Sequence, residues 1–236
     1  MKALILAAGK GSRLGNSSKE KSKALVLVAG QELLCHQLRF LDIPKIKKIG
    51  LVVGYHGKAT AELAKSKNPQ IEIFENKDYE QGNILSLKAA LPFLDDDCLI
   101  LNVDHIYPQR ILSAVLEQAK GITAACDFNR PLVADDMKIT RDAQGNLKAI
   151  DKGLKKYDGG YIGMTFLPRS KLEIYRKAFE KTLAALGPSA SVEKVLATLA
   201  AQNEPVAIAD TSGIRWLEVD TLEDLQKAEA SLMSIY

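Results

Sequence analysis

The chain has 236 residues, of which 47% are hydrophobic and 26% charged, and its net charge is +3. This length and balance suit one α/β domain with a sizeable core, and so small a net charge gives no case for a nucleic-acid partner. No apolar stretch approaches the roughly 18 residues of a membrane span, and the apolar N-terminal run is too short for a secretory signal. Cys35, Cys98 and Cys126 lie far apart among apolar neighbours, which favours buried free thiols over disulfides or a metal cage. We therefore expect a cytoplasmic protein without a membrane span.

Short apolar runs alternate with segments of helical period, which predicts parallel strands joined by right-handed crossovers. The second half adds a hairpin around the Gln144-Gly145-Asn146 turn and a last helix with Thr221 as N-cap. The expected fold is a single domain over 1–236, a three-layer Rossmann-like α/β structure with a mostly parallel sheet and a small β-hairpin region. Expected strands are 2–7, 48–54, 71–74, 98–104, two within 137–151, 159–167 and the late apolar segments 205–210 and 214–220, and expected helices are 31–41, 57–66, 82–94, 169–185, 190–202 and 222–233.

Three junctions between polar and charged residues fall at the carboxyl ends of predicted strands, at 9–13, 75–82 and 104–107. Ligands bind outside the carboxyl ends of strands in sheets of this kind. Basic residues are also concentrated early in the chain, which suggests an anionic ligand, although a solvated loop is the usual role of such a run. These early basic residues are Lys10, Arg13, Lys19, Lys21 and Lys23.

The stretch "LAAGKGSRLG" at 6–15 follows the first predicted strand. A glycine-rich turn at this place can ring a phosphate with backbone N–H groups. Two common phosphate motifs do not fit: Leu14 occupies the third glycine position of the dinucleotide fingerprint, and the spacing is not that of a P-loop.

The stretch closely resembles the opening of the sugar-nucleotidyltransferase-like (NTP transferase) family, whose signature is L-A-A-G-x-G-x-R-[LM] followed by Pro-Lys. Lys23 occupies the place of the signature lysine, and Ser22 stands where the family usually has proline. Since serine does not fix φ as proline does, we expect Lys23 to lie on a mobile surface arm that orders when nucleotide binds. The resemblance implies that Arg13 and Lys23 bind the nucleotide phosphates and that the loop residues hold the nucleotide: Leu6, Ala7, Ala8, Gly9, Lys10 and Gly11.

Two aspartates, Asp104 and Asp220, end predicted strands at distant points of the chain. If they converge, they form a divalent-metal pair, because Mg²⁺ is commonly held by one or two carboxylates together with substrate phosphates. In the resembled family the corresponding aspartates hold the metal. An aspartate alone is more often a helix cap or turn residue, and the two together with the glycine loop favour the metal site.

The segments "YEQGNILSL" (79–87) and "ILNVDHIY" (100–107) are most similar to cytidylyltransferases that act on small phosphorylated alcohols, such as inositol 1-phosphate or phosphocholine. The resemblance implies that CTP reacts with such an acceptor and that pyrophosphate is released. Two alternatives stay open: a sugar-1-phosphate nucleotidyltransferase that uses UTP, dTTP or GTP, and a nucleotide-binding regulatory domain without turnover. For the oligomeric state, we consider a homodimer. The remaining implied site residues are Gln81, Gly82 and Asn83 at the base or ribose, Lys152 at the acceptor phosphate, and His105, Gly160 and Tyr161 at the acceptor.

Overall fold

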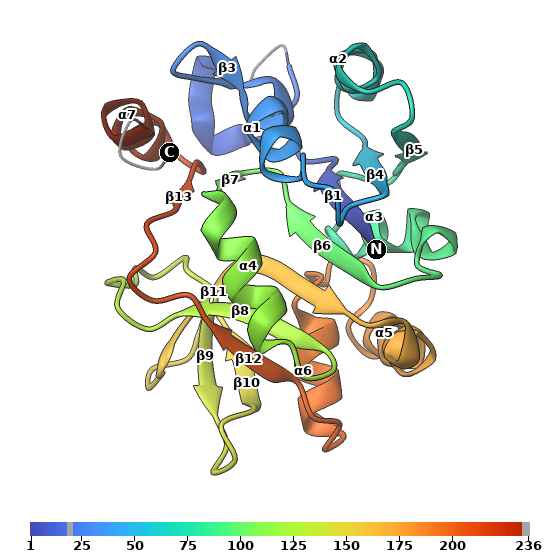
Figure 1. Cartoon of the computed structure of the whole chain (residues 1–236), viewed down its shortest axis with the longest axis vertical. Coiled ribbons are helices and arrows are strands. Elements are labelled where there is room, and N and C mark those ends of the chain that lie inside the picture. The colour runs from blue at the N-terminus through green and yellow to red at the C-terminus, as the bar shows by residue number, and fades with distance from the viewer. Residues whose placement is uncertain (18–20, 233–236) are drawn as a thin grey trace.

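Residues 1–17 and 21–232 are described in the computed structural model, and within them helices cover both faces of a mixed sheet (Figure 1). Lys19 of the basic run and residue 233, the last of the expected final helix, lie outside the described residues.

The parallel half of the sheet has β1 (Lys2–Ala7) at its centre, with β4 (Lys48–Val53) and β6 (Cys98–Asn102) on either side and β5 (Glu72–Glu75) beyond β4. All three pairings are parallel, as the alternation of strands and helices predicts. Every residue of β1 is buried, and successive side chains belong to opposite layers of the core. The apolar run at the N-terminus is therefore the central strand of the domain.

The second half of the sheet is built on β11 (Gly159–Leu167), which runs antiparallel to β6. The predicted hairpin is confirmed as β9 (Lys138–Arg141) and β10 (Leu147–Asp151), and β9 pairs with the start of β11. A further strand, β8 (Thr123–Asp127), pairs antiparallel with β11 between Gly160 and Phe166, and β12 (Ala207–Asp210) pairs in parallel with β8. The sequence pattern did not predict β8 or the helix that precedes it.

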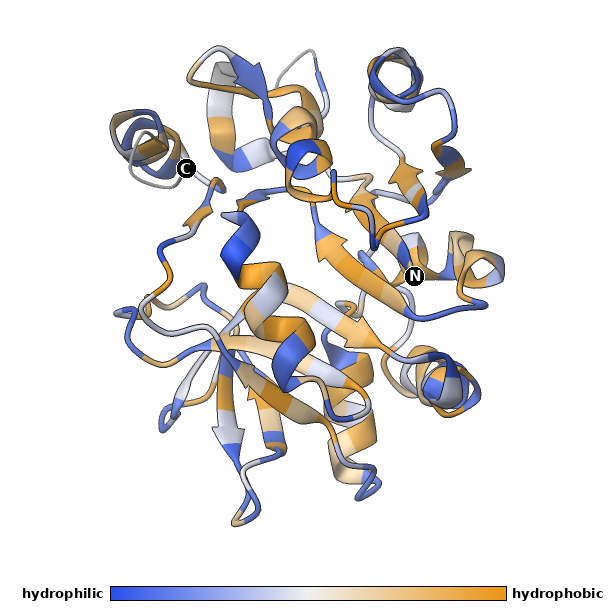
Figure 2. Ribbon diagram, viewed as in Figure 1, coloured by the Kyte–Doolittle hydropathy of each residue, from blue (hydrophilic) through white to orange (hydrophobic). Residues whose placement is uncertain are grey.

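Helices pack on both faces of the sheet, and hydrophobic residues concentrate on the strands and on the inner sides of the helices (Figure 2). One face is covered by α1, α2 and α4, and the other by α3, α5 and α6. Figure 1 shows α4 in front of β8 and β11 and α6 behind them. The predicted three-layer Rossmann-like fold is thus confirmed. The bounds of these helices are α1 Leu33–Phe40, α2 Gly57–Lys67, α3 Ile84–Ala89, α4 Gln109–Gln118, α5 Leu172–Leu186 and α6 Lys194–Ala201.

Outside the main sheet, β7 (His105–Ile106) pairs with β13 (Leu217–Glu218), and β2 (Leu27–Val28) pairs with β3 (Gln31–Glu32). The final helix is α7 (Leu222–Ser231), and Thr221 is its N-cap, as predicted. Thr221 and Asp224 form a reciprocal capping box, and the Asp224 carboxylate also accepts from the backbone N–H of Asp220 at 3.3 Å. The cap therefore fixes the backbone at a predicted site residue.

Three cysteines, Cys35, Cys98 and Cys126, are buried free thiols, as expected. Among residues 1–17 and 21–232, no helix combines the length and the apolar character needed to cross a bilayer.

The capping box predicts a measurable stability difference between two acidic residues of the same helical turn. Replacing Asp224 by Ala removes the cap, so Asp224→Ala should lower the free energy of unfolding by about 1 kcal/mol. Glu223→Ala is the matched control, because it removes an acidic residue from the same helical turn. The only ion pair lost is the exposed one with Lys227, which contributes about 0.3–0.5 kcal/mol. Urea denaturation of both variants measures the difference, and equal losses would contradict a role of the box.

Candidate active site

A polar hollow of about 330 Å³ opens at the carboxyl ends of β1 and β6. It is lined by segments from most of the chain, including the glycine loop, the β6–β7 turn, the loop before β9, the start of α6 and the end of β13. Ten predicted site residues line it: Gly9, Gly11, Arg13, Lys23, Asn83, Asp104, His105, Lys152, Tyr161 and Asp220.

The short ladder between β7 and β13 brings the two predicted aspartates together. Glu218 is paired with His105, and the backbone N–H of Val219 donates to the carbonyl oxygen of Asp104 at 2.9 Å. This pairing joins the segment after β6 to the segment before α7, so Asp104 and Asp220 lie in neighbouring chain segments. The β6–β7 turn is itself held by Gln37 of α1, whose side-chain amide donates to the carbonyl oxygens of Asn102 and His105 at 3.1 and 2.6 Å.

Lys23 lies between the two aspartates and is 7% exposed. Its ammonium donates to Asp104 Oδ2 at 2.6 Å and to Asp220 Oδ1. The expectation of a mobile surface arm is therefore wrong: the two carboxylates hold the ammonium group in place. Burial alone would lower the pKa of Lys23, but Asp104 and Asp220 outweigh it and raise the pKa, so the lysine is charged.

Every carboxylate oxygen of the aspartate pair has a protein donor. Asp104 Oδ1 pairs with His105 Nδ1 at 2.6 Å, and Asp220 Oδ2 accepts from Arg13 Nη2 at 2.6 Å. Burial would raise the pKa of Asp104, but Lys23 and His105 outweigh that effect and hold it well below its usual range. Burial would likewise lower the pKa of His105, and here the carboxylates of Asp104 and Glu218 raise it.

His105 is a buried residue that orients Asp104. Its ring stacks on Tyr107 and on Trp216 with ring centroids 5.5 Å from each, and an added Cβ at Gly163 would lie 2.7 Å from the ring. Trp216 is buried, as expected, and its indole N–H donates to Asp127 at 2.9 Å. The imidazole is thus packed against two aromatic rings, and its Nδ1 contacts the carboxylate.

A second ion-pair group crosses the hollow. Asp135, from the loop before β9, pairs with Arg13 and, at 2.6 Å, with Lys152 Nζ. Arg13 therefore contacts Asp135 and Asp220 at once. Asp135 is not among the predicted site residues, because the loop before β9 carries no motif.

The local structure around Lys23 explains two residues of the signature. Gly11 has φ +67, and an added Cβ would lie 3.0 Å from Lys23 Cβ, so only glycine fits here. Ser22 is fully buried with φ −58 and ψ 150, which is the backbone conformation that proline would impose. Its hydroxyl accepts from the N–H of Ala24 at 3.3 Å, so serine caps the turn at Lys23–Leu25 where proline would fix it.

The segment from Gln81 to Asn83 supports another wall of the hollow. An added Cβ at Gly82 would lie 2.4 Å from the carbonyl oxygen of Ala190, and Asn83 Oδ1 accepts from the N–H of Val192 at 2.7 Å. Asn83 lines the hollow, whereas Gln81 and Gly82 are not among its lining residues. The resemblance placed these residues at the base or ribose; in the structure two of them position the segment before α6.

The other predicted residues do not line the hollow. Leu6, Ala7 and Ala8 are buried core residues of β1 and its end. Lys10 is exposed and pairs with Glu80. Gly160 is buried, and an added Cβ would lie 2.8 Å from Leu132.

The aspartate pair fits a divalent cation that takes its remaining ligands from elsewhere. Asp104 and Asp220 both reach the one ammonium of Lys23, so their oxygens converge on a single point. No cluster of three metal-ligating side chains occurs within residues 1–17 and 21–232. Two carboxylates are the donor set of a magnesium ion that completes its coordination with phosphates and water.

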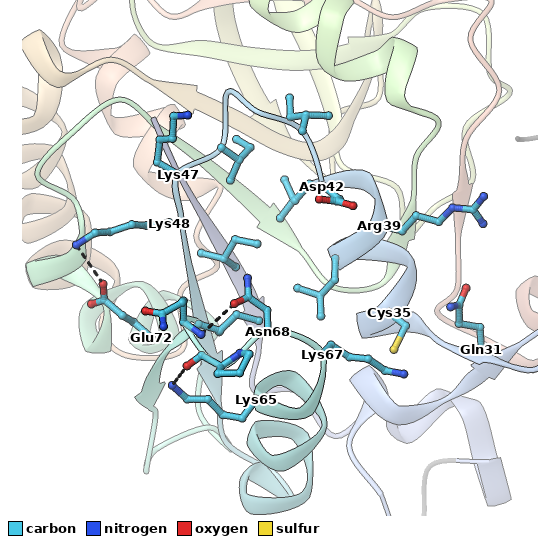
Figure 3. A pocket seen from close by; sticks show the side chains of 18 residues that line it. Gln31, Cys35, Arg39, Asp42, Lys47, Lys48, Lys65, Lys67, Asn68 and Glu72 are labelled. Atoms are coloured by element: carbon cyan, nitrogen blue, oxygen red, sulfur yellow. Dashed lines mark hydrogen bonds and ion pairs between the residues drawn. The ribbon is translucent and has the colours of Figure 1, made fainter.

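A larger hollow of about 910 Å³ lies between the ends of α1 and α2 and the start of β4 (Figure 3). Basic side chains, including Lys47, Lys48 and Lys67, surround it. It faces the amino ends of the parallel strands, whereas the predicted site lies at their carboxyl ends. None of the predicted site residues is among its described lining residues.

Three comparisons relate the chain to known proteins. Residues 3–142 match the MobA-like NTP transferase domain. The chain is 32% identical over 234 residues to a "Bifunctional IPC transferase and DIPP synthase" of Rubrobacter xylanophilus, which covers 98% of this chain and 52% of that protein. The chain thus spans about half the length of this curated relative.

Two solved structures share the fold. One is the inositol-1-phosphate CTP transferase from T. maritima, with a TM-score of 0.85, 20% identity and coverage of 99% of this chain and 94% of the other. The second is the CTP:phosphocholine cytidylyltransferase from Streptococcus pneumoniae, with a TM-score of 0.76, 21% identity and coverage of 98% of each chain.

Removal of the Lys23 ammonium should expose the repulsion between the two aspartates. Lys23→Ala should lower the free energy of unfolding by about 3 kcal/mol, because it leaves partly buried carboxylates without their shared cation. Added Mg²⁺ should raise the melting temperature of Lys23→Ala by more than it raises that of the unaltered protein. Lys10→Ala, which removes an exposed lysine of the same loop, should show neither effect. Equal Mg²⁺ effects in all three proteins would contradict a cation site between Asp104 and Asp220.

The close packing of Gly82 against the backbone at 188–190 predicts that a larger residue there lowers stability. Gly82→Ala places a methyl group against the backbone at 188–190 and should lower stability by about 1–3 kcal/mol. Gly9→Ala is the control for the loss of a glycine without close contact, since no atom of the described residues lies within 4 Å of its added Cβ and its φ is not positive. Thermal unfolding compares them, and a Gly82→Ala variant as stable as the unaltered protein would show that the segment yields freely.

Proposed function

Because the chain belongs to the family of MobA-like NTP transferase domains, we propose that it transfers the cytidylyl group of CTP to a small phosphorylated alcohol and releases pyrophosphate. The observation that carries this proposal is the meeting of Arg13, Lys23, Asp104 and Asp220 in one hollow beside the glycine loop. The names of the similar proteins favour CTP and a phosphorylated alcohol as substrates.

In this reaction an oxygen of the acceptor phosphate attacks the α-phosphorus of the nucleotide. The new P–O bond forms as the bond to the β-phosphate oxygen breaks, and the electron pair leaves with pyrophosphate. The attacking oxygen is already anionic, so no general base is needed. Positioning and neutralisation of charge therefore provide the catalysis.

Cationic side chains of the hollow can position the phosphates and neutralise their charge. We assign Arg13 and Lys23 to the triphosphate, with Lys10 at the rim, and Lys152 to the acceptor phosphate. In the structure Lys23 and Arg13 are bound to Asp220, and Arg13 and Lys152 are bound to Asp135. The carboxylates hold these cations in place until phosphates compete for them, which keeps the site organised before the substrate arrives.

Asp104 and Asp220 would hold Mg²⁺, and His105 would keep the Asp104 carboxylate oriented. When bound, the ion supplies positive charge that aligns the α-phosphate and the acceptor. The Lys23 ammonium occupies the point on which the two carboxylates converge, so Lys23 would leave at least one of them where the pair holds the ion. Lys23 would then be available to the phosphates.

A panel of substrates tests the proposed function. The protein is incubated with CTP, UTP, dTTP or GTP, with Mg²⁺ and with phosphorylated alcohols or sugar 1-phosphates, and pyrophosphate is measured. We expect release with CTP and a phosphorylated alcohol, and Asp104→Asn should reduce it at least 100-fold because a cation ligand is lost. Release only with a sugar 1-phosphate would favour the sugar-nucleotide alternative. No release with any pair would favour a regulatory nucleotide-binding domain.

A further inference from the structure

The start of α6 brings two polar side chains without partners to the hollow. Glu193 is 6% exposed and lines the hollow, yet no described residue donates a hydrogen bond or forms an ion pair with its carboxylate. Ser191 also lines the hollow, and its hydroxyl is buried without a hydrogen-bond partner within the described ranges. Buried polar groups are nearly always paired, so a buried unpaired hydroxyl beside a largely buried carboxylate that faces the hollow needs an explanation.

A structural role at the helix start does not account for Glu193. The N–H groups of Lys194, Val195 and Leu196 donate to backbone carbonyl oxygens of residues 191–193, and the Glu193 side chain makes no cap bond. The neighbouring cation, Lys194, pairs with Asp151 instead. The carboxylate thus stabilises neither the first turn by a hydrogen bond nor an adjacent lysine.

The segment is nonetheless held firmly in position. Asn83 accepts from the N–H of Val192, and Gly82 allows its close approach to the backbone at 188–190. Glu193 also lies in a small recess with Tyr161, Tyr175 and Asn102. The Tyr161 hydroxyl is hydrogen-bonded to the Thr165 hydroxyl at 2.8 Å, and within the described residues no hydrogen bond joins it to Glu193. The polar groups of Ser191 and Glu193 are therefore built into the wall of the hollow.

We propose that Ser191 and Glu193 recognise the alcohol part of the acceptor by accepting hydrogen bonds from donor groups that it carries beyond its phosphate. This inference rests on the proposed function and names the substrate class: a phosphorylated alcohol with further hydroxyl or N–H groups. Such donors satisfy a carboxylate that nothing in the described chain satisfies. An alkyl phosphate without such donors leaves it unpaired.

Variants of Glu193 test the proposal with four acceptors. Inositol 1-phosphate supplies hydroxyl donors, phosphoethanolamine supplies N–H donors, and phosphocholine and propyl phosphate supply neither. The unaltered protein should have a KM at least tenfold lower for one of the first two than for propyl phosphate. Glu193→Ala should raise that KM about tenfold or more with little change in kcat, because a charged hydrogen bond is lost.

Glu193→Gln separates the two kinds of donor. Its amide oxygen still accepts from a hydroxyl, so KM for a polyol phosphate should change less than about fivefold, whereas KM for an ammonium acceptor should rise as in Glu193→Ala. Glu180→Gln, an exposed carboxylate on α5, is the matched control and should leave every KM unchanged. Ser191→Ala should raise KM for the preferred acceptor to a smaller degree.

Calorimetric binding of the acceptors is measured in parallel, so that the proposal is tested whether or not turnover occurs. Absence of pyrophosphate from every pair contradicts the proposed function alone. An unchanged acceptor KM and affinity in Glu193→Ala, equal use of propyl phosphate by the unaltered protein, or no acceptor binding at all contradicts the recognition role of Ser191 and Glu193.

Discussion

The ammonium of Lys23, shared by Asp104 and Asp220, is the interaction on which the site depends. It joins three parts of the chain that are distant in sequence: the segment after the glycine loop, the end of β6 and the segment before α7. Because Lys23 is buried, its charge is tolerated only with both carboxylates in place. The rest of the site is arranged around this contact, with Arg13 on Asp220 and His105 on Asp104.

Several elements of the fold position the residues that make this contact. The β7–β13 ladder aligns the two aspartate segments, and the α7 capping box fixes the backbone at Asp220. Gly11 lets the glycine loop approach Lys23, and Ser22 gives the chain the conformation that proline would impose. Each of these residues lies near the hollow, and each acts by placing another residue.

The sequence predicted the parallel core and the position of the site, because strand periodicity, the glycine loop and the motif residues are local signals. Burial of Lys23 was not predicted, since it depends on two aspartates that lie 81 and 197 residues further along the chain. Asp135, Ser191 and Glu193 were missed for a similar reason: they stand in segments without a motif, and only the tertiary fold brings them to the hollow. Asn83 was expected at the base or ribose, and it does line the hollow. The hydrogen bond that its side-chain Oδ1 accepts from the Val192 N–H was not predicted, because it joins residues 109 positions apart.

In the proposed function a metal–nucleotide complex would take over the carboxylates that Lys23 occupies in the free protein. A crystal structure with CTP and Mn²⁺, in which anomalous scattering locates the metal, is the decisive test. We expect an anomalous peak on Asp104 and Asp220, with the Lys23 ammonium moved from at least one carboxylate to a phosphate oxygen. A metal bound elsewhere, with Lys23 still bridging both aspartates in the presence of CTP, would contradict it.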